Sequence, residues 1–305
     1  MIDTCGSYLQ RQVTTDQRFV GAYQRNSSGL VDLSPALPVK IFSINNPIIR
    51  LRSLTRLHPR HKMEDMHFQS WSLSDKGLKR HGNQDSFMVD ERAGVFIVAD
   101  GVGGHMGGEV ASALAVETAR EVIAHPKANM FTPKEVLMQA YRESNFRIFQ
   151  RAHQEAKLSG MGTTMVMAYV RASRLYIANV GDSRCYLYRK PYVWQLTEDH
   201  SLVNEQIRMG ILSEEVARKT IAKNVITRSV GFEPEVFPDI IEREITVNDT
   251  YILCSDGLSG MITDQRIAQI LNEAALEKAA PQLLQQALTN GGDDNVTVLV
   301  LNFQE

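Results

Sequence analysis

Three aspartates stand where an apolar run of the sequence meets a polar one. Asp100 and Asp256 each end such a run and precede a glycine, whereas Asp294 comes just before the last apolar run. In an antiparallel sheet these run ends would share one edge, where neighbouring carboxylates raise each other's pKa unless a cation neutralises them. Carboxylate oxygens select hard ions such as Mg²⁺ or Mn²⁺ rather than zinc. The pattern therefore predicts a metal site.

Further residues nearby have side chains or backbone groups that suit the same site. Gly101 allows close approach of the backbone and leaves its carbonyl free as a ligand. Upstream, Asp85 could join the metal shell, and the planar fork of Arg80 suits a phosphate group. Each feature alone has an ordinary interpretation, since Asp-Gly is a common turn sequence and Arg80 beside Lys79 is typical of a solvated turn. Only their combination favours the metal site.

Short apolar runs predict the strands that must position these residues. The runs span residues 95–99, 163–170, 175–180, 251–254 and 296–301. The polar turn between the second and third runs predicts an antiparallel hairpin. We expect the first strand to stop at Asp100 and to be followed by a glycine-rich loop through Gly108.

Four helices are expected between these strands. The first follows the glycine-rich loop and presents one apolar face, formed by Val110, Leu114, Val122 and Ile123. The second begins at a capping box of Thr132 and Glu135, Thr263 caps the third, and Pro281 starts the fourth. Hairpins combined with paired helices favour the α+β class, with antiparallel sheet, over a doubly wound parallel sheet.

The overall composition limits the possible classes of function. The chain has 305 residues and a formal net charge of −2, which argues against nucleic acid or a membrane surface as a partner. No apolar run approaches the roughly 20 residues that span a bilayer. Three cysteines, Cys5, Cys185 and Cys254, lack the spacing of a disulfide framework or a CxxC metal site. We therefore expect a cytoplasmic protein.

Residues 1–65 differ in character from the rest of the chain. Prolines are frequent, and acidic residues are absent between Leu33 and Lys62. This segment is interpreted as a flexible or misassigned extension, with translation starting at Met63 or Met66, while a basic docking segment is the alternative. The folded domain is expected over residues 66–305.

Six short sequence blocks together resemble the protein phosphatase 2C family, especially its compact bacterial members. In the order of the family, the blocks are RHGNQDS (80–86), VADGVGG (98–104), GTT (162–164), GDSR (181–184), SDGL (255–258) and DNV (294–296). Several independent blocks in the right order are far more specific than one glycine-rich loop. The resemblance covers about residues 68–303.

The resemblance implies a fold and a cofactor. The fold would be a four-layer α/β/β/α sandwich with two central antiparallel sheets. The 66–305 domain would be a metal-dependent PPM-type catalytic domain with two Mn²⁺ or Mg²⁺ ions per active site and a weaker third ion. By position, Asp100 would bridge both ions, the Gly101 carbonyl would bind one, and Asp256 and Asp294 would hold the other.

Other roles also follow from the resemblance. Asp85 would support metal-bound water, Asp182 would accommodate the third ion together with Asp256, and Arg80 would bind the substrate phosphate. The irregular region 198–238 resembles the flap that influences substrate choice. Val102 stands where animal-type members have a histidine that is proposed as general acid, and His105 is displaced from that position, so the acid stays unassigned.

The implied function is hydrolysis of phosphoserine and phosphothreonine by attack of a metal-bridging water. A monomeric protein serine/threonine phosphatase that opposes a bacterial serine/threonine kinase and acts on that kinase's targets in signalling is expected. Two alternatives come from other classes: an inactive regulatory module, which would usually lack the ligands present here, and a carboxylate-metal nuclease, which would need a basic groove. His153, His200, Cys185 and Cys254 are interpreted as ordinary surface or packing residues.

Overall fold

The computed structural model describes residues 67–103, 107–171, 173–213 and 225–304. The chain divides into a unit of residues 1–38 and a unit of residues 39–305, and every described residue belongs to the second. The predicted extension over residues 1–65, its boundary at residue 66, and both Cys5 and His105 lie outside the described residues.

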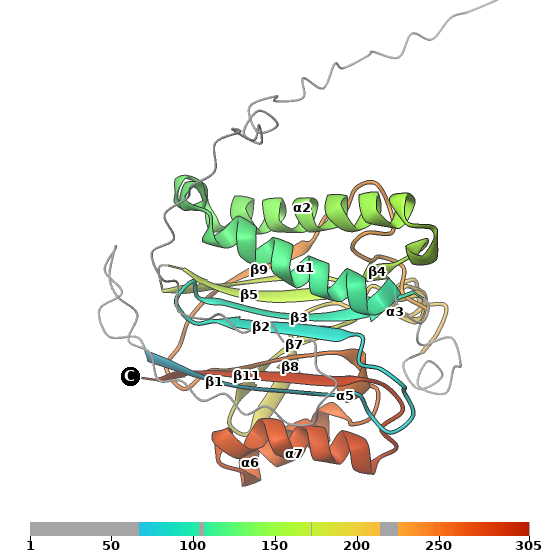
Figure 1. The fold of residues 1–305 in the computed structure, drawn as a ribbon. Helices are drawn as coiled ribbons and strands as arrows, with labels where there is room; N and C mark the ends of the chain where they lie inside the picture. The colour runs from blue at the N-terminus through green and yellow to red at the C-terminus, as the bar shows by residue number, and fades with distance from the viewer. Residues whose placement is uncertain (1–66, 104–106, 172, 214–224, 305) are drawn as a thin grey trace, which may run out of the picture. The chain divides into compact units, whose positions relative to one another are not determined.

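Two antiparallel sheets form the centre of the fold (Figure 1). In spatial order, the first sheet contains β2 (Asp85–Asp90), β3 (Val95–Val102), β5 (Met165–Arg171), β6 (Arg174–Val180) and β9 (Asp239–Glu244), and the short β4 (Gly162–Thr163) pairs with β3. The second sheet contains β1 (His67–Asp75), β11 (Val296–Gln304), β10 (Thr250–Cys254), β7 (Arg184–Arg189) and β8 (Tyr192–Gln195).

Helices cover the outer face of each sheet (Figure 1). The first sheet is covered by α1 (Gly107–Ala124) and α2 (Pro133–Gln154), and the second by α6 (Asp264–Glu273) and α7 (Leu276–Thr289). The remaining helices are short: α3 (Leu202–Arg208), α5 (Asp256–Ser259) and the 3-10 helices η2 (Pro126–Met130) and η3 (Ala156–Leu158). The predicted α+β class and the four-layer α/β/β/α sandwich are therefore confirmed.

Aromatic side chains fill the space between the two sheets. The ring of Phe68 packs edge-on against Phe96 with centroids 5.5 Å apart, and Tyr251 packs in the same way against Phe303 at 5.8 Å. All four side chains are buried. Burying a large apolar side chain contributes about 1.5–3 kcal/mol, so this layer holds the sheets together at a fixed spacing.

Local sequence signals located several elements correctly. The capping box at the start of α2 is present, because Thr132 Oγ1 accepts from the Glu135 N–H at 3.3 Å and Glu135 Oε2 accepts from the Thr132 N–H at 2.8 Å. Thr263 caps α6. The predicted hairpin is formed by β5 and β6, in which Val170 lies opposite Leu175.

Two predictions about elements were wrong. Asp100 does not end its strand, because β3 continues to Val102 by pairing with β4. Pro281 lies inside α7, which begins at Leu276, because burial of one face of this helix outweighs the single backbone hydrogen bond that proline cannot make. The predicted apolar face of α1 packs against the core, with Ile123 buried and Val110, Leu114 and Val122 half-buried, and the small side chains Ala111, Ala115 and Ala119 are buried beside it.

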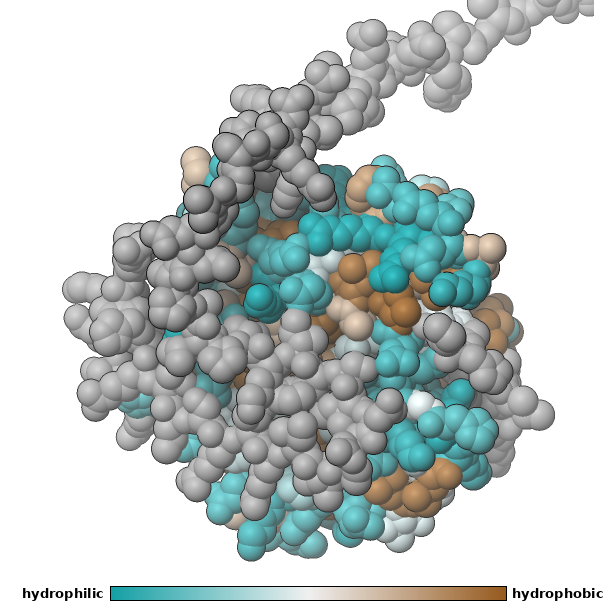
Figure 2. All heavy atoms as spheres, viewed as in Figure 1, coloured by the Kyte–Doolittle hydropathy of each residue, from teal (hydrophilic) through white to brown (hydrophobic). Residues whose placement is uncertain are grey.

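Apolar side chains are mostly internal. On the face shown in Figure 2, the surface that can be seen is largely hydrophilic, and apolar residues gather in separate patches. In the described part of the chain, the helices are all too short or too polar to cross a membrane. Cys185 and Cys254 are free and buried, as expected of packing residues.

Candidate metal centre

The strand register brings the first two predicted carboxylates together. Asp85 at the start of β2 is the direct partner of Asp100 in β3. Asp256 follows β10 at the first residue of α5, and Asp294 lies two residues before β11. One pair therefore lies in the first sheet and the other flanks strands of the second, and the charges of Asp256 and Asp294 raise the pKa values of both Asp85 and Asp100.

Asp85 is buried between the sheets with only one of its carboxylate oxygens satisfied. Its Oδ2 accepts hydrogen bonds from Ser255 Oγ at 2.7 Å and Thr297 Oγ1 at 2.6 Å, both from the second sheet side, whereas its Oδ1 has no hydrogen-bond partner. Burial raises the pKa of Asp85 to about 7, against the lowering effect of the two hydroxyls. An unsatisfied buried carboxylate oxygen is costly, and a cation would relieve that cost.

Asp100 is fixed in position through its backbone. Thr164 Oγ1 accepts from the Asp100 N–H at 2.9 Å, and the Asp100 carbonyl accepts from Thr163 Oγ1 at 2.7 Å. Burial, followed by the charges of Asp85 and Asp256, raises the pKa of Asp100 well above its ordinary value. The GTT block of the sequence thus orients this aspartate from the neighbouring strand.

Asp256 and Asp182 have the same kind of environment. The pKa of Asp256 is raised by burial and then by the charge of Asp294, and its Oδ1 is buried without a hydrogen-bond partner. Asp182 is 9% exposed, and burial followed by the charge of Asp256 raises its pKa to about 7. The predicted third-ion pair is therefore close enough to interact electrostatically.

Arg80 lies at the exposed side of the cluster. Its Nη2 donates to Asp294 Oδ2 at 2.6 Å, and half of the arginine side chain is exposed. The hydrogen bond to Asp294 is the main cause of the raised pKa of Arg80. A phosphate entering here would meet a guanidinium that is already held beside the carboxylates.

Close backbone packing explains the glycine at position 101. A Cβ at Gly101 would stand 2.0 Å from the carbonyl oxygen of Gly108 and 2.7 Å from that of Gln84. The Gly101 N–H donates to the Gln84 carbonyl at 3.1 Å. Only glycine lets β3, the segment before β2 and the start of α1 meet at this point.

The carboxylates fit divalent cations in chemistry, although they do not form a closed cage. Within the described ranges, no three His, Cys, Asp or Glu side chains are grouped tightly enough to hold a metal ion. Asp85 directs one oxygen to two hydroxyls, and Asp294 accepts from Arg80 at Oδ2 and from the Asn295 N–H at Oδ1. The unpartnered buried oxygens of Asp85 and Asp256, together with the raised pKa values, show where a cation would be stabilised.

Sequence reasoning missed the residues that support the cluster. Ser255 and Thr297 donate hydrogen bonds to Asp85. Asn295 fixes the loop between β1 and β2 by donating to the carbonyls of Lys76 and Gly82 at 2.8 and 2.9 Å. Ser255 and Asn295 belong to the SDGL and DNV blocks, so attention to the neighbours of each aspartate would have found them.

Two other predictions concern residues around the centre. Val102, which stands at the family's histidine position, is 39% exposed at the end of β3. His200 is buried, as interpreted: its Nδ1 accepts from the Gly181 N–H at 3.0 Å. The region 198–238 contains α3 and is otherwise largely irregular over its described residues.

Known proteins resemble this chain in sequence and in fold. Residues 55–296 match the family model of protein phosphatase 2C. The serine/threonine phosphatase stp of Listeria innocua is 39% identical over 235 residues, which cover 75% of this chain and 93% of that protein. The structure of the Mycobacterium tuberculosis serine/threonine phosphatase PstP/Ppp gives a TM-score of 0.73 at 34% identity and covers 78% of this chain and 99% of that one. A catalytic domain of PstP in complex with two manganese ions gives a TM-score of 0.71 at 33% identity, covering 79% of this chain and all of that one.

Proposed function

Because the chain belongs to the protein phosphatase 2C family and is therefore a protein serine/threonine phosphatase, we propose that it hydrolyses phosphoserine and phosphothreonine at the carboxylate cluster with two divalent cations. The observation that carries this proposal is the pair of buried, unpartnered oxygens on Asp85 and Asp256. Asp85 begins β2 of the first sheet and Asp256 follows β10 of the second, and divalent cations with their bound water would satisfy both oxygens.

The described residues suggest how the cations would be divided. Asp100 would serve both ions, the Gly101 carbonyl would bind one of them, and Asp256 and Asp294 would hold the other. Asp182 would share a third, weaker ion with Asp256, in keeping with their electrostatic interaction. When bound, the ions would lower the pKa of a water molecule and offset the negative charge of the phosphoryl group.

Arg80 would orient the substrate. Its guanidinium is half exposed and holds Asp294 with one nitrogen, so further N–H groups can face a phosphate. Asp85, held by two hydroxyls through one oxygen, has its other oxygen free to orient a water molecule. Protonation of the leaving serine or threonine oxygen is assigned to no described residue.

The cellular setting extends the proposal beyond the site. Relatives named serine/threonine phosphatases occur in Listeria and Mycobacterium. We infer that this protein acts in the cytoplasm as a monomer, with Mn²⁺ or Mg²⁺, and that it removes phosphate from a serine/threonine kinase and its targets in a signalling pathway.

Substitution of Asp100 tests the metal mechanism. Asp100→Asn should abolish Mn²⁺-dependent hydrolysis of p-nitrophenyl phosphate and of a phosphothreonine peptide, and should weaken Mn²⁺ binding measured by calorimetry, because a neutral amide replaces the shared ligand. Asp90→Asn, at the opposite end of β2, is the matched control and should retain both properties. Full turnover in excess chelator would contradict the proposal.

A further inference from the structure

A surface hollow of about 620 Å³ lies in the segment that leads from the irregular region into β9. It is lined by residues 226–229 and 232–237. Two phenylalanines in this lining are largely exposed, Phe232 at 62% and Phe237 at 53%. Apolar rings that line the same hollow are typical of an interaction site, unlike single exposed apolar side chains, which are common on surfaces.

The hollow is preformed, because its backbone is tied to the fold at several points. Val230 and Thr163 exchange two backbone hydrogen bonds, at 2.8 and 3.0 Å. Asn145 of α2, itself 2% exposed, accepts from the Gly231 N–H at 2.6 Å and donates to the carbonyls of Glu233 and Pro234 at 2.9 and 3.1 Å. A site held in this way loses little conformational entropy on binding.

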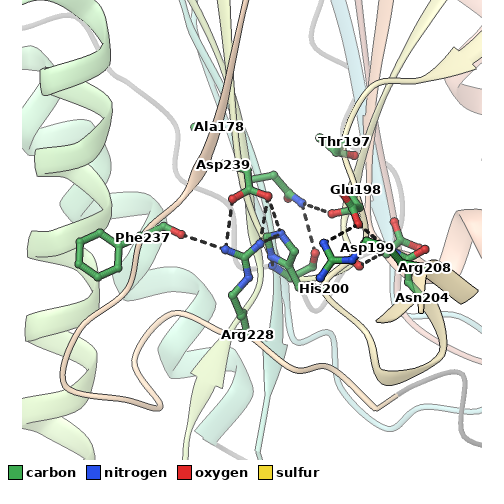
Figure 3. Close-up of polar contacts among 12 residues, drawn as sticks. Ala178, Thr197, Glu198, Asp199, His200, Asn204, Arg208, Arg228, Phe237 and Asp239 are labelled. Carbon is green, nitrogen blue, oxygen red and sulfur yellow. Dashed lines mark hydrogen bonds and ion pairs between the residues drawn. The ribbon is translucent and has the colours of Figure 1, made fainter. Parts of the chain in front are cut away.

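An ion pair closes the two ends of the segment. Arg228 binds Asp239 through both guanidinium Nη atoms, at 3.2 and 3.0 Å, and it also contacts His200. Figure 3 shows the Arg228 guanidinium between Asp239 and His200, while the ring of Phe237 points away from this cluster. The positive charge of Arg228 is therefore already compensated.

The remaining charge of the hollow is negative. Glu233 and Glu235 are exposed, and in the described part of the chain neither carboxylate makes an ion pair or a side-chain hydrogen bond. By contrast, Glu242 and Glu244 on the adjoining strand β9 are both paired with Arg174. Two unpaired carboxylates beside two exposed aromatic rings suit a cation with an aliphatic stem.

The hollow adjoins the metal centre through β4. Thr163 of β4 is the register partner of Gly101, and on its other side it bridges Val230. Neighbouring strands lie about 4.8 Å apart, so Val230 lies about 10 Å from Gly101. An extended peptide advances about 3.3 Å per residue, so this distance corresponds to about three residues of substrate.

We propose that this hollow receives a lysine or arginine side chain located about three residues from the phosphorylated residue of the substrate. Glu233 and Glu235 bind its charge, and Phe232 and Phe237 cover its stem. The inference rests on the proposed phosphatase activity and adds to it a substrate class, phosphoproteins with a basic residue near the phosphorylated site.

A phosphothreonine peptide series tests this. One arginine is moved through each position from about four residues before to about four residues after the phosphothreonine, against an all-alanine reference. Arginine at one position near the predicted spacing should raise kcat/KM about fivefold, mainly through KM, as expected of partly exposed ion pairs. The preference should shrink as salt is raised from 50 to 500 mM, since such pairs are screened.

The double variant Glu233→Gln, Glu235→Gln should abolish this preference, so that kcat/KM is about the same for the arginine peptide and for the all-alanine reference. Glu277→Gln, an exposed substitution on α7 over the other sheet, is the matched control and should keep it. A flat arginine series, or a preference that survives the double substitution, overturns the inference. If neither wild type nor control hydrolyses any phosphopeptide with Mn²⁺, the proposed function itself fails, which is a different result.

Discussion

Replacing Asp85 with asparagine isolates the cost of ionising a buried carboxylate in metal-free protein. The folded-state pKa of Asp85, about 7, lies above its ordinary value of 3.8. At about 1.4 kcal/mol per pH unit, this difference corresponds to about 4 kcal/mol of unfolding free energy. Because the folded-state pKa is raised, that stability is fully present below about pH 4 and is lost as pH rises through about 7. Asparagine does not ionise and avoids the loss.

The assay is urea unfolding of wild type and Asp85→Asn in chelator between pH 5 and pH 8. Over this range the unfolding free energy of wild type should fall relative to that of the variant by about 2–3 kcal/mol. Taking the difference removes the contributions of groups that do not interact with Asp85, such as His200, whose pKa is lowered by burial and whose ionisation makes stability rise with pH. Added Mn²⁺ should reverse the trend, since the cation binds the ionised form. Parallel pH curves for the two proteins in chelator would refute the reasoning.

Two further predictions concern packing and domain extent. Gly101→Ala should lower the unfolding free energy by about 2 kcal/mol or more, because its Cβ meets the Gly108 carbonyl, whereas Gly82→Ala, which has open space around it, should change it little in thermal melts. Deleting residues 1–65 should leave the melting temperature unchanged and keep p-nitrophenyl phosphate turnover within about twofold of that of the full chain. A large drop in the melting temperature or in turnover would show that this segment supports the domain.

Sequence signals predicted the elements well where these depend on interactions between residues that are close in the sequence. The capping box at Thr132 needs only residues three apart in sequence, so the sequence located the start of α2. The start of α7 depends instead on burial of a face against β1 and β11, which is a long-range property, and Pro281 misled the prediction. Likewise, α1 approaches α2 and the sheet closely, so its small residues face the core.

The residues of the site also differ in whether local sequence could reveal them. The aspartates were identifiable because each stands at a boundary between apolar and polar sequence. The hydroxyl of Thr297 was not, since it reads as an ordinary strand residue and contacts Asp85 across 212 sequence positions. The prediction that Asp100 ends its strand failed because β4 is only two residues long and has no periodic signal of its own.

The position of the last strand affects when the protein can become active during synthesis. β11 is the last strand of the described chain yet lies inside its sheet, between β1 and β10, and Asp294 lies two residues before it. A ribosome-bound chain that lacks this segment has neither Asp294, which we propose as a ligand of the second ion, nor the Thr297 hydroxyl that donates to Asp85. Competence to remove phosphate therefore arises only after nearly the whole domain has emerged, which keeps incomplete chains from acting on phosphoproteins.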